Sequence, residues 1–171
     1  PRPKEFKLTE FDRPKTTEDS ILMRVEMCGV CGTDVHNFKG EWPGVNYPII
    51  PGHEVVGVVE ELGRKVEENM IVYGGPLKEG DRIHVVPGVP CGKCYYCKYI
   101  PHRVNMCQNR EIYGVTRSCK DYPHLFGGWA QYMYILPRSH VYKMPSNIPP
   151  DLCALAEPLT VGVRAISRAS M

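Results

Sequence analysis

Four cysteines in one short segment form the most specific chemical pattern in the sequence. Cys91, Cys94 and Cys97 follow at intervals of three, and nine residues separate Cys97 from Cys107. Four thiolates suit tetrahedral zinc and leave no open position for a substrate. The spacing predicts a structural zinc lobe at about residues 88–110. A disulfide pair with spare cysteines is the alternative, and Cys119 competes with Cys107 as the fourth ligand.

A second set of potential ligands lies in two stretches further upstream. These are Cys-Gly-Val-Cys-Gly-Thr-Asp-Val-His at residues 28–36 and Pro-Gly-His-Glu at residues 51–54. A thiolate, an imidazole and polar groups at the junctions of loops and strands can form an open, catalytic zinc site. Taken alone, Cys28 and Cys31 could instead be a redox-active pair, but no βαβ pattern surrounds them.

The composition restricts the class of protein. The 171 residues are 43% hydrophobic and carry a net charge of +2, which excludes a disordered chain. No apolar run approaches the roughly 18 residues of a membrane span. The basic residues are scattered, so nucleic-acid binding is not expected. No signal peptide is visible, and we expect a cytoplasmic protein whose eight cysteines serve as metal ligands or catalytic groups rather than disulfides.

The elements that must position these groups are mostly strands. Glycine and proline are both abundant, with 16 of each, which favours a strand-rich and loop-rich domain. Runs rich in Val, Ile, Tyr and Phe predict strands, and residues 69–80 between them are expected to be irregular. A helix is predicted after Pro149-Pro150-Asp151. The predicted strands are Phe6–Phe11, Ile21–Met27, Glu54–Leu62, Asp81–Val86, Trp129–Leu136 and His140–Met144.

The motifs at residues 28–36, 52–54, 91–107 and 157–159, taken in order, resemble the zinc-containing medium-chain alcohol and polyol dehydrogenases. The resemblance runs from Phe6 to Ala169. It implies a mainly β fold with short helices, similar to the GroES chaperonin, over residues 1–156. Residues 157–171 would begin the helix that links this catalytic domain to a Rossmann domain.

The chain contains no Gly-x-Gly-x-x-Gly dinucleotide fingerprint. We therefore expect the Rossmann domain to be absent from these 171 residues, and the residues to be inactive alone. The family's first strand would precede Pro1.

The resemblance also implies ligands for the open site. Cys31 and His53 occupy the places of two catalytic-zinc ligands, and Glu157 occupies that of the third, a carboxylate as in the sorbitol-type branch. An acidic residue is favoured in the first turn of a helix in any case, and Cys153 is a rival ligand. The expected cofactors are one catalytic and one structural Zn²⁺, with NAD or NADP in the complete enzyme.

Four neighbouring residues have expected roles in catalysis. Thr33 could take the proton of an alcohol whose pKa zinc has lowered, and His36 could pass it to solvent. Asp34 would accept the second ring N–H of His53, and Glu54 would tune or transiently bind the metal. Thr33 and Asp34 could also simply cap a short helix.

The resulting hypothesis is a dehydrogenase for a small secondary alcohol or polyol, forming a homo-oligomer when complete. A threonine dehydrogenase is the nearest alternative. A non-catalytic, structural zinc module is an alternative from a different class. Trp42, Tyr47 and Phe38 could line a substrate pocket, although loop aromatics also serve simply in packing.

Overall fold

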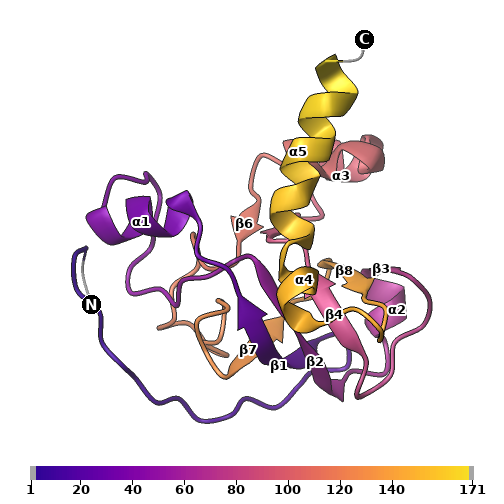
Figure 1. The fold of residues 1–171 in the computed structure, drawn as a ribbon, viewed down its shortest axis with the longest axis horizontal. Helices are drawn as coiled ribbons and strands as arrows, with labels where there is room; N and C mark the ends of the chain where they lie inside the picture. Colours follow the sequence, from indigo (N-terminus) through magenta and orange to yellow (C-terminus); the bar gives the residue numbers. More distant parts are fainter. Residues whose placement is uncertain (1–2, 170–171) are drawn as a thin grey trace.

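The computed structural model describes residues 3–169, most of which form a domain around one curved six-stranded sheet (Figure 1). Its strands are β1 (Ile21–Cys28), β2 (Val55–Leu62), β3 (Ile71–Tyr73), β4 (Arg82–Val85), β7 (Tyr132–Ile135) and β8 (His140–Lys143). A two-stranded sheet pairs β5 (Gly88–Val89) with β6 (Glu111–Ile112). The helices are α1 (Gly32–Lys39), α2 (Val66–Asn69), α3 (Tyr95–Tyr99), a 3₁₀ helix (Pro101–Met106), α4 (Pro150–Ala154) and α5 (Ala156–Ala169).

The strand order of the large sheet is β3-β8-β4-β2-β1-β7. All neighbouring pairs are antiparallel except β3 and β8, which are parallel. The pairing of β1 with β2 runs from Ile21 opposite Leu62 to Cys28 opposite Val55. A side chain at Gly57 would collide with the backbone oxygen of Arg24, which explains the glycine inside this strand. The prediction of a mainly β domain with short helices is confirmed.

The apolar residues of β1, β2, β4, β7 and β8 meet in one core. Apolar side chains removed from water contribute roughly 25 cal/mol per Å² of buried surface, so this core is the main source of the domain's stability. Its fully buried members include Ile21, Met23, Val55, Val59, Ile83, Val85, Phe126, Met133, Ile135 and Val141.

Five of the six predicted strands are present, with boundaries that differ by up to three residues. The prediction of a strand at Phe6–Phe11 is wrong, because this part of the described chain is extended without pairing in a sheet. Phe6 instead stacks on Phe38 with ring centroids 4.8 Å apart, and Phe11 stacks on His124 at 5.1 Å. Leu8 between them is 98% exposed. In this segment the two phenylalanines pack on other rings and Leu8 faces solvent, so the alternating pattern does not reflect a strand.

The expectation that residues 69–80 are irregular is also wrong in part. This segment contains β3, which pairs in parallel with β8. The partner strand lies far along the chain, and a three-residue strand leaves little periodicity to detect. Tyr73 and Tyr142 stack on neighbouring strands, with ring centroids 4.5 Å apart.

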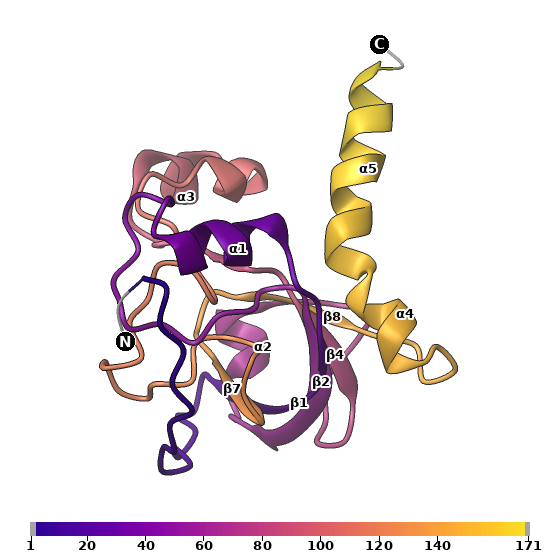
Figure 2. The same cartoon turned by 60° about the vertical axis from the view of Figure 1, so that its left-hand side comes forward.

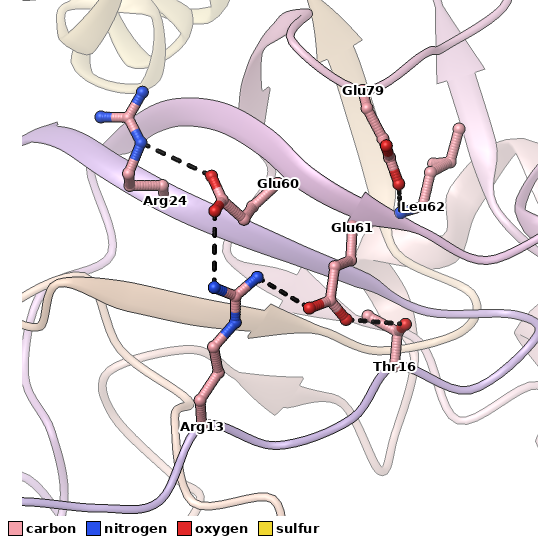
Figure 3. Close-up of polar contacts among 7 residues, drawn as sticks. All are labelled: Arg13, Thr16, Arg24, Glu60, Glu61, Leu62 and Glu79. Atoms are coloured by element: carbon pink, nitrogen blue, oxygen red, sulfur yellow. Dashed lines mark hydrogen bonds and ion pairs between the residues drawn. The ribbon is translucent and has the colours of Figure 1, made fainter.

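Charged side chains fasten the N-terminal segment to the sheet (Figure 3). The Arg13 guanidinium donates to Glu61 at 2.7 Å and to Glu60 at 3.4 Å. Arg24 approaches the other oxygen of Glu60 at 3.6 Å, and Thr16 donates to Glu61 at 3.2 Å. Each exposed ion pair is weak, but the bridging guanidinium fixes where the segment crosses β2.

The predicted C-terminal helix is split into α4 and α5 at Leu155. Figure 2 shows α5 projecting away from the sheet. Leu159, Val161, Val163 and Ile166 on this helix are 60–69% exposed. Met171, at the predicted end of the helix, lies outside the described residues. Among the described helices, none combines the length and apolar character needed to cross a membrane.

The buried His84 predicts how stability depends on pH. Its ring contacts the Val55 carbonyl at 3.0 Å, and burial lowers its pKa below the ordinary 6.5. The unfolded state therefore binds the proton first, so stability is complete above about pH 6.5 and falls on further acidification. The slope contributed by one group is at most about 1.4 kcal/mol per pH unit.

Urea unfolding between pH 7.5 and 5 measures this slope. We expect His84→Asn to reduce it and His102→Asn, a change at an exposed histidine, to leave it unchanged. Equal slopes in all three proteins would contradict the assignment to His84.

Candidate metal centres

The edge of the β1–β2 pair brings the two upstream motifs together. Cys28 at the end of β1 lies opposite Val55 at the start of β2. The Gly29 N–H donates to the Glu54 carbonyl at 2.8 Å, which extends the ladder by one step. Cys31 follows this edge and His53 precedes it. Antiparallel pairing therefore places them together although a long loop separates them in sequence.

Three potential ligands meet at this edge. Ligand atoms of Cys31, His53 and Glu54 all lie within 4.8 Å of one another. His53 is buried, and its Nδ1 has no hydrogen-bond partner among the described residues. The Asp34 carboxylate lies 3.7 Å from Nδ1, so a small shift of the ring would form a hydrogen bond between them. Nε2 would then remain available to bind a metal ion. Sulfur, nitrogen and oxygen donors at this spacing fit zinc.

The electrostatics of His53 agree with a ligand position. Burial lowers the pKa of His53, but Asp34 and Cys31 outweigh that effect and raise the pKa to about 9. Without metal, the imidazole therefore carries a proton at neutral pH. His53 would hold zinc only as the neutral imidazole, so a bound ion would require loss of this proton.

Asp34 connects the two ligand-bearing loops. Its carboxylate accepts the N–H of Cys31 at 2.9 Å and the N–H of Gly52 at 3.1 Å. Burial would raise the pKa of Asp34, but His53 and these two N–H groups lower it below its ordinary value. The side chain also caps α1, so the capping alternative and the predicted contact with His53 are compatible.

Thr33 lies beside Cys31, and His36 follows it by about one helical turn on α1. The Thr33 hydroxyl is 3.8 Å from the Cys31 sulfur. His36 is partly exposed, and its Nδ1 lies 2.8 Å from the Glu41 carboxylate. Glu41 was not predicted; Gly40 directly after a short helix is a signal for a turn that folds the chain back.

Glu157 faces this centre from the start of α5. It lies outside the group of mutually close ligand atoms that includes Glu54. Burial raises the pKa of Glu157, while His53 lowers it and Glu54 raises it further. Both residues therefore influence the Glu157 carboxylate electrostatically. Its role as the third ligand stays a prediction.

The four sulfurs of the downstream lobe form a second, separate group. Cys91, Cys94, Cys97 and Cys107 lie within 4.8 Å of one another, with sulfur–sulfur distances of 4.0, 3.5 and 3.8 Å for the pairs 91–97, 94–97 and 94–107. Four sulfurs held at about 2.3 Å by tetrahedral zinc lie about 3.8 Å apart. Backbone N–H groups of Cys97 and Gln108 lower the pKa of Cys94 to about 6, which favours the thiolate that binds zinc.

The remaining cysteines lie elsewhere. Cys119 is buried, and its N–H donates to the Pro48 carbonyl; it is not in the four-sulfur group. Cys153 packs with Val56 in a small apolar cluster. Burial raises the pKa of Cys28 to about 12, which opposes the thiolate that a redox pair requires.

Two of the three predicted pocket aromatics line a cavity that Asp34 also lines. Phe38 and Tyr47 line a cavity of about 1430 Å³ beneath the N-terminal segment. The Tyr47 hydroxyl donates to the Asn37 carbonyl at 2.6 Å, and Trp42 is 40% exposed. These contacts fit a packing role.

Comparison with known proteins identifies the family. The alcohol dehydrogenase GroES-like domain family matches residues 17–146. The chain belongs to this family. The predicted resemblance and the GroES-like fold are therefore confirmed.

Relatives of this GroES-like chain include dehydrogenases. L-threonine 3-dehydrogenase of Thermococcus kodakarensis is 38% identical over 89% of this chain and 39% of its own length. An uncharacterized zinc-type alcohol dehydrogenase-like protein of Haemophilus influenzae is 34% identical over 99% and 44%. The crystal structure of an alcohol dehydrogenase from Thermotoga maritima superposes with a TM-score of 0.71 at 38% identity, covering 88% of this chain and 39% of the other. The chain thus spans about two fifths of the length of these relatives, and residues 3–169, which the structure describes, form no Rossmann domain.

Substitution of a lobe cysteine tests the four-sulfur site. We expect Cys107→Ser to remove one zinc ion per chain and to lower the free energy of unfolding by more than about 4 kcal/mol. Cys119→Ser is the matched control and should keep the zinc. Zinc content by atomic absorption and unfolding in urea measure both effects. Equal zinc loss in the two variants would show that the lobe does not hold the ion.

Proposed function

We propose that these residues form the catalytic domain of a zinc-dependent, NAD(P)-linked dehydrogenase that oxidises a small secondary alcohol or polyol. Residues 1–156 would form this domain, and 157–171 would begin the helix toward a nucleotide-binding domain. The exposed apolar residues of α5, such as Leu159 and Ile166, support a helix that continues into another packed unit. The unpaired state of all eight cysteines supports a reducing, cytoplasmic location.

The contrast between the two ligand groups carries the proposal. The lobe offers four sulfurs, a closed set typical of structural zinc. The β1–β2 edge offers Cys31, His53 and Glu54, a mixed set typical of catalytic zinc, with the hydroxyl of Thr33 alongside. A purely structural zinc module needs only the first. The proposed zinc content is therefore one structural and one catalytic ion.

Zinc bound at the mixed site would polarise the alcohol oxygen and lower the pKa of its hydroxyl. Thr33 would accept the alcohol proton at Oγ1 while donating its own toward His36. His36 has a side chain that is 55% exposed, so it can release the proton to water. Asp34 would hold His53 in the tautomer that a metal requires. A nicotinamide cofactor, when bound, would supply the hydride acceptor. A provisionally assigned zinc-binding dehydrogenase of Sinorhizobium meliloti is bound to NADP; it is 33% identical with a TM-score of 0.72 over 90% of this chain and 39% of its own.

L-Threonine is a second candidate substrate. The L-threonine 3-dehydrogenase of Thermococcus kodakarensis is 38% identical over 89% of this chain. Threonine also contains a secondary alcohol, so the same metal centre would serve.

A substrate panel tests the proposed reaction. The zinc-loaded protein that contains these 171 residues is assayed for reduction of NAD⁺ and NADP⁺ with secondary alcohols, polyols and L-threonine. Turnover with a polyol or simple alcohol supports the first proposal, and turnover with threonine alone supports the second. One bound zinc ion per chain, without turnover of any substrate, would favour a structural module. The 171 residues alone should bind zinc but show no turnover.

Substitution of the two upstream cysteines separates zinc catalysis from redox chemistry. We expect Cys31→Ser to lower activity by more than about a hundredfold and to release one zinc, because a ligand is lost. Cys28→Ser should leave zinc content and most activity in place, since Cys28 is a packed neutral thiol. Initial rates and zinc content are the measurements. Loss of activity in Cys28→Ser with full zinc content would favour the redox alternative.

A further inference from the structure

The turn that ends α1 places an acidic side chain on His36. Gly40 adopts a left-handed conformation with φ 77° and ψ 23°. Its N–H donates to the Asn37 carbonyl at 3.0 Å, and the next N–H, of Glu41, donates to the His36 carbonyl at 2.9 Å. These two bonds form a Schellman motif, which folds the chain back over the last turn of a helix. The turn therefore brings Glu41 back beside His36, five positions earlier in the chain.

The contact between the side chains has a defined geometry. Glu41 Oε2 lies 2.8 Å from His36 Nδ1. The pKa of Glu41 is lowered, chiefly by His36 and to a smaller extent by Lys39 and Lys4, so the carboxylate is charged and can only accept hydrogen bonds. His36 must then be the donor at Nδ1.

This constraint determines the proton-accepting atom of His36. In a neutral imidazole one nitrogen is a donor and the other an acceptor, and the hydrogen bond at the first nitrogen selects the tautomer. With Nδ1–H directed at Glu41, the lone pair lies on Nε2. Thr33 precedes His36 by three residues, and positions i and i+3 share one face of a helix.

We propose that Glu41 is a positioning residue that holds His36 in the Nδ1–H tautomer, with Nε2 free to take a proton from the Thr33 hydroxyl. The proton enters at Nε2, the imidazolium is held by the Glu41 carboxylate, and the proton leaves to water. The role in proton transfer rests on the proposed dehydrogenase function, whereas the pairing of Glu41 with His36 does not depend on that function. Two lysines also face Glu41, Lys39 from α1 and Lys4 from the N-terminal segment. Their charges favour the ionised carboxylate, while its hydrogen bond is with His36.

A stabilising role alone does not explain the pair. Both side chains are about half exposed, at 55% and 52%, and exposed pairs contribute little to folding. The Schellman bonds also use only backbone atoms, so the turn does not need the carboxylate. The contact is therefore expected to act on the imidazole rather than on stability.

Nitrogen-15 NMR of histidine-labelled, zinc-loaded protein tests the pairing directly. In the wild type, neutral His36 should show the chemical shifts of a protonated Nδ1 and an unprotonated Nε2. In Glu41→Ala these shifts should move toward a mixture of tautomers, and in Glu41→Gln, which keeps an acceptor oxygen, they should stay closer to the wild type. Glu10→Ala, at another exposed carboxylate, is the control and should change nothing. Unchanged His36 shifts in Glu41→Ala would overturn the proposal.

Kinetics on the complete enzyme test the consequence. General-base catalysis by histidine contributes roughly 10²–10⁴-fold, so we expect Glu41→Ala to lower kcat by about tenfold with KM nearly unchanged. A normal kcat in a variant with altered tautomers would overturn the role in proton transfer. Absence of dehydrogenase activity in the wild type, with the expected shifts present, would instead refute the proposed function and leave the pairing intact.

Discussion

The organisation of the candidate catalytic centre depends on one buried carboxylate. Asp34 accepts the N–H groups of Cys31 and Gly52 and faces the ring of His53. Burying an ionised carboxylate is costly, and charge-assisted hydrogen bonds offset that cost only while both loops stay in place. The hydrogen bonds that stabilise the buried Asp34 carboxylate thus also hold the Cys31 thiol and the His53 imidazole close together.

The surrounding packing allows these loops little freedom. Gly52 has φ +92°, and a side chain there would collide with Trp129 and Cys28. Gly114, also with positive φ, packs directly on the backbone of Gly52. Because closely packed interiors resist displacement, the turn before His53 is held from two sides. Burial in this packing raises the pKa of Cys28, as expected of a thiol with a structural role.

Local sequence predicted those features that depend on local chemistry. Strands such as β1 and β2 show their apolar runs directly, and the spacing of the lobe cysteines is enough to bring four sulfurs together. Features that depend on distant partners were missed. β3 exists because β8 lies beside it, and Phe6–Phe11 has a strand-like pattern but pairs with no strand. Which acidic residue joins Cys31 and His53 was also missed: Glu54 lies in that group of ligand atoms and Glu157 does not.

The lobe has no hydrophobic core of its own. Neither α3 nor the 3₁₀ helix has a buried residue, and Tyr95 and Tyr99 are 60% and 72% exposed. Of the residues from Cys91 to Cys107, Cys94 and Cys107 are the buried ones. A segment of this size cannot exclude enough apolar surface from water to order itself. Metal–sulfur bonds at this site would supply the free energy that packing does not. Metal-bound cysteines would therefore stabilise the lobe as the apolar core stabilises the sheet. This difference explains why the lobe is visible in the spacing of its cysteines and the sheet in its hydrophobic pattern.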